Sequence, residues 1–177
     1  MFEKSGVSVE YFCTPVDARI IGWENNIHYC FIRGYRDMVF AVNPETCVDR
    51  YVYPLAMNFK DFLRLILSCG STTAVEQIVG WSKEQFEHFV VSKDNAIHPE
   101  QQKVLDVIKA SLKLKPIDEP YEYVKSVQGQ FNNCRCEIKY SNEYYDTLGL
   151  ERPDGTGSDI KLLEFAPVTF TFVKKDK

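Results

Sequence analysis

The chain contains no run of about 18 uncharged apolar residues, the length that a membrane-spanning helix requires. Its first ten residues, MFEKSGVSVE, lack the basic stretch and the apolar stretch of a secretory signal peptide. These absences predict a protein with no membrane span and no membrane partner. We therefore expect it in the cytoplasm.

A stripe of basic residues is also absent. The 21 lysines and arginines are scattered singly among 25 aspartates and glutamates, which gives a formal net charge of −4. Surfaces that bind nucleic acids are usually marked by clustered positive charge, so we expect no nucleic-acid partner. A mildly acidic surface is compatible with a basic protein partner.

The sequence lacks the short motifs that mark common catalytic and cofactor sites. It has no GxxxxGK[ST] or GxGxxG phosphate-binding loop, no GxSxG elbow and no HExxH helix. Its three histidines, His28, His88 and His98, stand far apart. We therefore expect no cofactor, no metal ion and no catalytic residue.

The six cysteines lie in apolar or turn contexts, and the chain is long enough to bury a core without disulfides, so we expect reduced thiols. Two pairs have a spacing that metal ligands can use: Cys134 with Cys136, and His28 with Cys30 on one face of a predicted strand. Zinc usually needs two such pairs, so we interpret both as structural.

Short runs rich in β-branched and aromatic residues occupy the N-terminal part of the chain. They predict three or four antiparallel strands joined by hairpins, because turn residues such as Asn, Asp and Gly separate them. The runs are ARIIGW, IHYCFIRG, DMVFAVN and VDRYVYP. We expect the last run, which Pro54 ends, to lie near an edge of the sheet.

From Asn58 onward the apolar residues recur every three or four positions, which predicts helices. Asn58 is the expected N-cap of the first, whose apolar stripe is expected to pack across the sheet. The stripe consists of Phe59, Phe62, Leu63, Ile66 and Leu67. Further helices are predicted after Ser71 or Thr72, from Ser82, from His98 to before Pro116, and over residues 119–131.

The C-terminal part of the chain contains two candidate strands, CEIKY at residues 136–140 and LEFAPVTFTFV at residues 163–173. No internal repeat or long linker divides the chain. The sequence therefore predicts one α+β domain over residues 1–177, with an N-terminal antiparallel sheet, a helical middle, and one or two C-terminal strands.

The stretch LSCGST, residues 67–72, offers two interpretations of Cys69: a nucleophile on a tight turn, or the last turn of a helix that Gly70 caps. We favour the structural interpretation, because the negative end of a helix dipole raises the pKa of a thiol. His98 with Glu100 is a second candidate for catalysis, and neither candidate has a partner adjacent in sequence.

Aromatic residues make up 14% of the chain. Trp23 and Trp81 stand where predicted elements meet turns, and we interpret both as core residues. Tyrosines projecting from strands or lying near turns would suit a protein interface. These are Tyr29, Tyr35, Tyr51, Tyr53, Tyr121, Tyr123, Tyr144 and Tyr145.

Residues 38–68, MVFAVNPETCVDRYVYPLA followed by NFKDFLRLIL, resemble the late part of the SUKH superfamily. This superfamily groups fungal cell-wall-assembly regulators with bacterial toxin-immunity proteins. Ala56, Phe59, Phe62 and Leu63 match its phrase of an alanine followed by spaced phenylalanines and a leucine. The chain lacks the family's opening amphipathic helix and its asparagine-glycine-glycine segment, so the resemblance is to a divergent or rearranged member.

The resemblance implies a single SUKH-like domain that acts without catalysis, as an intracellular protein-binding module. It further implies an immunity protein that covers a bacterial toxin such as a nuclease. The residues themselves leave two alternatives open: a small cytosolic hydrolase or transferase with a site assembled by the fold, and a regulatory or structural subunit unrelated to toxins.

Overall fold

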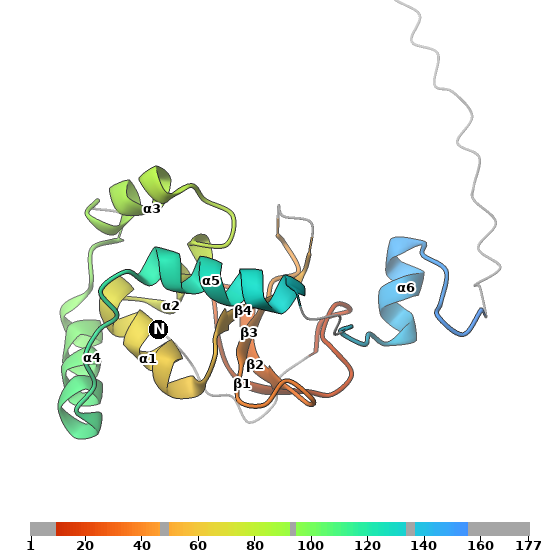
Figure 1. The fold of residues 1–177 in the computed structure, drawn as a ribbon, viewed down its shortest axis with the longest axis horizontal. Coiled ribbons are helices and arrows are strands. Elements are labelled where there is room, and N and C mark those ends of the chain that lie inside the picture. Colours follow the sequence, from red (N-terminus) through yellow and green to blue (C-terminus); the bar gives the residue numbers. More distant parts are fainter. Residues whose placement is uncertain (1–9, 47–49, 93–94, 134–136, 156–177) are drawn as a thin grey trace, which may run out of the picture.

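The computed structural model describes residues 10–46, 50–92, 95–133 and 137–155. It has an N-terminal four-stranded antiparallel sheet followed by helices, which confirms the predicted α+β class (Figure 1). The predicted strand at residues 163–173 lies outside the described residues.

The sheet is a simple meander in which each strand pairs with the next, in the order β1-β2-β3-β4. Its strands are β1 (Ala18–Glu24), β2 (Ile27–Ile32), β3 (Val39–Val42) and β4 (Val52–Ala56). Asn25 and Asn26 connect β1 to β2 with φ angles of 49° and 61°. Asparagine tolerates this left-handed conformation, and two such residues form the tight turn that a hairpin favours. The four strands and their predicted hairpins are thus confirmed.

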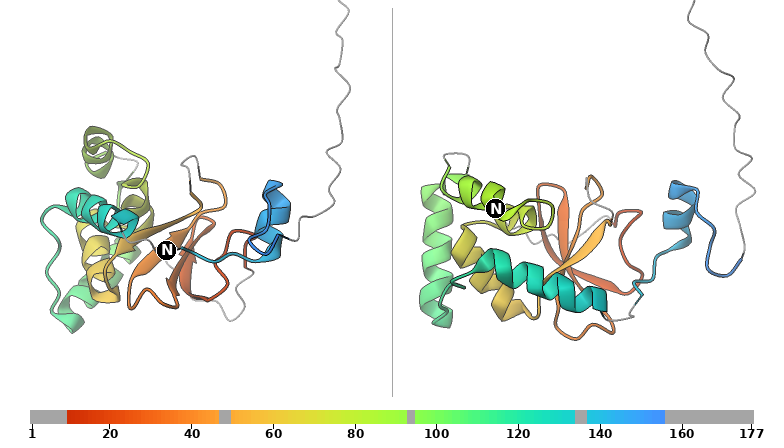
Figure 2. Two further views of the ribbon diagram at one scale, coloured as in Figure 1. Left: turned by 45° about the vertical axis from the view of Figure 1, so that its right-hand side comes forward. Right: turned by 45° about the horizontal axis from the view of Figure 1, so that its top comes forward.

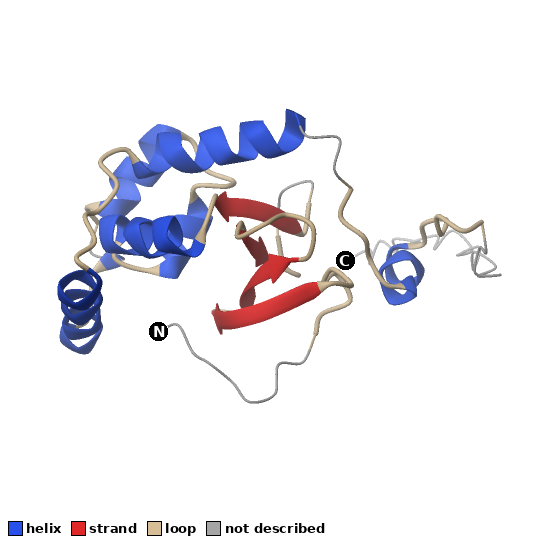
Figure 3. Cartoon of the chain, turned by 60° about the horizontal axis from the view of Figure 1, so that its bottom comes forward, coloured by secondary structure: helices blue, strands red, loops and turns tan. Residues whose placement is uncertain are grey.

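Pro54 lies inside β4 and does not end it, so the predicted end of this strand is wrong. The strand continues to Ala56 because, among the described strands, β4 pairs with β3 alone, and a proline is tolerated on an edge strand. Every residue of β4 is nevertheless buried, because helix α5 (Pro120–Asn133) packs against this edge strand (Figure 3). The prediction of an edge position is confirmed.

Five helices, α1 to α5, gather on one side of the sheet, and α6 (Asn142–Leu148) lies on the other (Figures 1 and 2). The remaining helices are α1 (Phe59–Cys69), α2 (Thr72–Gln77), α3 (Lys83–Val90) and α4 (Pro99–Leu112). Helix α4 lies outermost, separated from the sheet by α1. Within the described ranges, every helix falls short of the length and apolar character needed to cross a membrane.

The predicted helix starts are confirmed by capping hydrogen bonds. The side chain of Asn58 accepts a hydrogen bond from the backbone N–H of Asp61, and the side chain of Ser71 accepts one from the backbone N–H of Ala74. Ser82 and Gln85 cap each other reciprocally at the start of α3. Such caps satisfy the backbone N–H groups that the first turn of a helix leaves without partners.

Helix α1 has two apolar faces, where the sequence predicted one stripe. Phe62, Leu65 and Cys69 are buried against the sheet, and the ring centroid of Phe62 lies 5.3 Å from that of Tyr29. These residues belong to the helix-face core. Its buried members are Ile27, Tyr29, Val39, Ala41, Tyr53, Leu55, Ala56, Phe62, Leu65, Cys69, Ala74, Val75, Ile78, Phe86 and Val124.

A second buried cluster covers the opposite face of the sheet. Its members are Cys13, Cys30, Ile32, Phe40, Val42, Val52 and Phe131, with Tyr140 and Tyr144 packed at its margin. Residues 137–140, the described part of the predicted 136–140 strand, form an isolated bridge between Tyr140 and Pro15 and are not a strand. Helix α6 was not predicted from the sequence.

The burial of Phe62 yields a stability prediction. Phe62 is fully buried, so Phe62→Ala should lower the free energy of unfolding by about 3 to 5 kcal/mol, the range for deleting a buried phenylalanine. Denaturant unfolding measures this loss. Phe59→Ala on the same helix is the matched control and should cost less, because Phe59 is already 40% exposed. Equal losses, or a loss below about 1 kcal/mol for Phe62→Ala, would contradict the packing of α1 on the sheet.

Candidate functional site

An apolar groove lies between α1 and α4 and encloses a cavity of about 140 Å³. Helix α1 lines it with Phe59, Leu63 and Ile66, spaced so that they share one face of the helix. The full lining is Glu24, Phe59, Phe62, Leu63, Ile66, Gly70, Thr72, Gln101, Val104, Leu105 and Ile108. We call this feature the α1–α4 groove.

Polar groups in the lining of the groove make defined hydrogen bonds. The buried carboxylate of Glu24, at the end of β1, accepts a hydrogen bond from the Thr72 hydroxyl. The Gln101 side chain donates to the Gly70 carbonyl at 2.9 Å, which ties α4 to the end of α1. Gly70 has a φ of 86°, and a Cβ there would stand 2.7 Å from Ile97, so glycine is required at this junction.

Large apolar side chains remain exposed beside the groove. Of the residues that line the groove, Phe59 on α1 is 40% exposed and Val104 on α4 is 43% exposed. Val107 and Leu112, elsewhere on α4, are 62% and 54% exposed. Single exposed apolar residues are ordinary on protein surfaces, whereas a group of them along a groove is typical of an interaction site. The α1–α4 groove is therefore the principal candidate for a docking surface.

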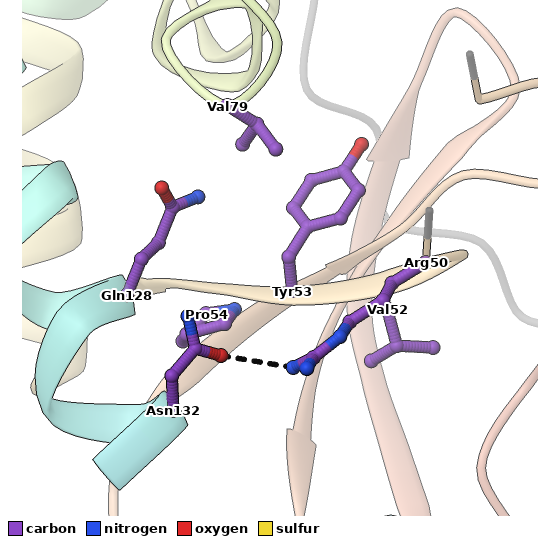
Figure 4. A pocket seen from close by; sticks show the side chains of 7 residues that line it. All are labelled: Arg50, Val52, Tyr53, Pro54, Val79, Gln128 and Asn132. Carbon is purple, nitrogen blue, oxygen red and sulfur yellow. Dashed lines mark hydrogen bonds between the residues drawn. The ribbon is translucent and has the colours of Figure 1, made fainter. Parts of the chain in front are cut away.

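A second hollow lies where α5 crosses β4 (Figure 4). It has a volume of about 240 Å³ and is lined by Arg50, Val52, Tyr53, Pro54, Val79, Gln128 and Asn132. Arg50 Nη1 donates to Asn132 Oδ1 at 2.9 Å, a bond that joins residues 82 positions apart in the chain. We call this feature the β4–α5 pocket.

Helix α2 is held on the sheet by a buried carboxylate. Glu76 accepts hydrogen bonds from Asn43 Nδ2 at 3.0 Å and from the Tyr53 hydroxyl. Burial, together with the neighbouring Glu76 carboxylate, raises the pKa of the Tyr53 hydroxyl. Tyr53 therefore stays protonated and donates to Glu76, which fixes the position of a residue in the floor of the β4–α5 pocket.

Cys69 is the last residue of α1 and is 2% exposed. Gly70 follows in the left-handed conformation, as predicted. Burial raises the pKa of the Cys69 thiol to about 12, the direction that was predicted. The thiolate that a nucleophile requires is strongly disfavoured at this position.

His28 and Cys30 lie on the same face of β2, as predicted, and both are buried. The His28 ring stacks on Tyr11 with centroids 4.0 Å apart, and its Nδ1 makes no hydrogen bond to the described residues. Burial lowers the pKa of His28. The two residues are part of the packing on this face of the sheet.

His98 and Glu100 form the start of α4. His98 is the N-cap, and its Nδ1 accepts a hydrogen bond from the Glu100 backbone at 3.3 Å. Cys134 and Cys136 lie outside the described residues. Among the residues that the structure does describe, no three His, Cys, Asp or Glu side chains converge as a metal site would require.

The aromatic candidates divide between the core and the surface. Trp23 and Trp81 are half-buried, and the Trp81 ring packs edge-on against Phe89. Tyr29 and Tyr53 are buried, so their side chains are not available to a protein partner. The tyrosines predicted near turns lie in helices: Tyr121 and Tyr123 in α5, Tyr144 and Tyr145 in α6.

Sequence reasoning missed both hollows. A signal for the groove was present, because Val104, Leu105, Val107 and Ile108 cover more of α4 than one buried stripe needs. No comparable signal pointed to the β4–α5 pocket, since its residues come together only when α5 crosses the sheet.

Comparison with protein-family models, with curated proteins and with solved structures found no match to the chain.

The burial of Cys69 predicts slow alkylation. In the native protein, Cys69 should react with iodoacetamide far more slowly than an unfolded-chain thiol at the same pH, because both its exposure and its thiolate fraction are low. Peptide mapping by mass spectrometry resolves the rate at Cys69, with the same thiol in denaturant as the control. Native labelling as fast as in denaturant would contradict this structural role.

The lowered pKa of His28 predicts a loss of stability in acid. The folded state favours neutral His28, so protons bind preferentially to the unfolded chain once the pH falls below about 6.5, the ordinary value. The stability of the wild-type protein relative to His28→Gln should therefore decrease as the pH falls from about 7 to 5. His88→Gln, at an exposed histidine of α3, is the matched control. A difference between wild type and His28→Gln that stays constant with pH would disprove this coupling.

Proposed function

We propose that the protein is a non-catalytic protein-binding module whose α1–α4 groove receives an amphipathic helix of a partner protein. The observation that carries the proposal is the apolar groove, in whose lining the side chains of Phe59 and Val104 are exposed. A groove between two helices is a common receptor for the apolar face of a third helix.

The dimensions of the groove suit such a partner. Helix α4 has 14 residues and so extends for about 21 Å, enough to lie alongside about four turns of another helix. Apolar residues from both helices would form the centre of the interface. A standard interface buries about 800 Å² on each partner, and the exposed residues around the cavity would supply its outer part.

Polar residues of α4 pair with one another on the side of the helix that faces away from the groove. Lys103 pairs with Glu100 at 2.8 Å, and Gln102 Nε2 donates to Asp106 at 2.9 Å. These pairs keep the outer face of α4 polar, so the apolar character of the helix is concentrated toward the groove.

The resemblance of residues 38–68 to the SUKH superfamily supports a more specific form of the proposal. This segment includes most of α1, one wall of the groove. In this form the protein acts in the cytoplasm as an immunity protein, and its partner is a bacterial toxin domain such as a nuclease. The groove itself does not depend on this choice of partner.

Site-specific cross-linking tests the docking surface. A photoreactive amino acid is placed at Val104, in the groove, or at Val91, which is 84% exposed beyond the end of α3. A partner should cross-link at position 104 and not at position 91. Mass spectrometry then identifies the cross-linked partner, which is purified so that its affinity can be measured directly.

Matched substitutions then measure the contribution of the groove. Val104→Lys should weaken binding to the purified partner at least about tenfold, because it places a charge in the apolar centre of the interface. Val91→Lys, the same change at an exposed valine outside the groove, should leave the affinity unchanged. Equal affinities for the two variants, or cross-linking only at position 91, would overturn the proposal.

A further inference from the structure

The β4–α5 pocket has an apolar floor and a polar wall. Tyr53 and Pro54 of β4 form the floor, and Val79, just beyond α2, faces them. Gln128 and Asn132 reach the pocket from α5, one helical turn apart, and Arg50 stands at its margin (Figure 4). The pocket shares no lining residue with the α1–α4 groove.

The hydrogen bond from Arg50 fixes the orientation of Asn132. A guanidinium group only donates hydrogen bonds, so Asn132 must present its oxygen to Arg50, and its amide nitrogen remains a donor. This bond uses one of the five N–H groups of the guanidinium. The wall of the pocket therefore contains several hydrogen-bond donors: the guanidinium of Arg50 and the side-chain amides of Asn132 and Gln128.

Positive charge stands at the margin of the pocket. The chain carries a net charge of −4, whereas the described residues that line the pocket include Arg50 and no acidic residue. The carboxylate of Glu76 lies behind this lining, where it accepts a hydrogen bond from the Tyr53 hydroxyl. Lys125 lies one turn before Gln128 on α5, and its Nζ donates to the carbonyl of Val79, which is itself a lining residue. Two cationic groups thus stand at or beside the pocket.

We propose that the β4–α5 pocket binds a small carboxylate with a flat apolar body. A carboxylate accepts two parallel hydrogen bonds from a guanidinium group, and the amide donors of the α5 wall lie beside it. The apolar body rests on Tyr53 and Pro54. The volume of about 240 Å³ is below the range of about 300 to 1,000 Å³ typical of pockets for drug-sized ligands, so the ligand is smaller than these.

Titration with benzoate tests the proposal, with benzamide as the uncharged analogue of the same shape. Benzoate should bind and benzamide should bind at least about tenfold more weakly, because only benzoate carries the charge that pairs with Arg50. Calorimetry measures the affinities. In ¹⁵N-resolved NMR spectra, benzoate should shift the side-chain amide signals of Gln128 and Asn132.

Paired arginine variants assign the binding to the pocket. Arg50→Gln should weaken benzoate binding at least about tenfold. Arg19→Gln, at an exposed arginine of β1, is the matched control and should leave it unchanged. The proposal is overturned if benzoate does not bind at millimolar concentration, if benzamide binds equally well, or if Arg50→Gln has no effect. Equal binding of inorganic phosphate would also overturn it, because the site would then select charge and not the carboxylate group.

Discussion

The packing of α1 between the sheet and α4 is the interaction on which both the core and the groove depend. One face of α1 buries Phe62 and Leu65 in the helix-face core, against strands that contribute Tyr29 and Leu55. This contact fixes the rotation of α1 about its axis, so its other apolar residues, such as Leu63, turn toward α4. The groove therefore exists because α1 is apolar on more of its circumference than the sheet can cover.

Helices α2 and α5, which follow α1 in the chain, also pack on the sheet and stabilise this arrangement. Gly70 reverses the chain after α1, and α2 is then tied to the sheet through Glu24 with Thr72 and through Glu76 with Tyr53. A buried carboxylate is costly unless it is hydrogen-bonded, so these contacts define one position for α2. Because α5 packs on the β4 edge, the same arrangement creates the β4–α5 pocket, whose lining is separate from that of the α1–α4 groove.

Local features of the fold were predictable, and features that depend on distant contacts were not. The strands follow from β-branched runs, and the helices from spacing and from caps such as Asn58 and Ser82. The continuation of β4 past Pro54 depends on its edge position, which only the assembled sheet determines. Likewise, Arg50 meets Asn132 across 82 positions, a contact that no local pattern contains.

Backbone hydrogen exchange, measured with and without the purified partner that cross-linking identifies, tests the central claim most directly. It reports the exchange rate in all of the helices in one experiment. If a partner helix docks in the α1–α4 groove, slower exchange should be concentrated in the backbone of α1 and α4, since docking restricts the opening of both. The α6 helix, on the other side of the sheet, should exchange at its original rate. Protection confined to α6 or β1, with α1 and α4 unchanged, would contradict the account.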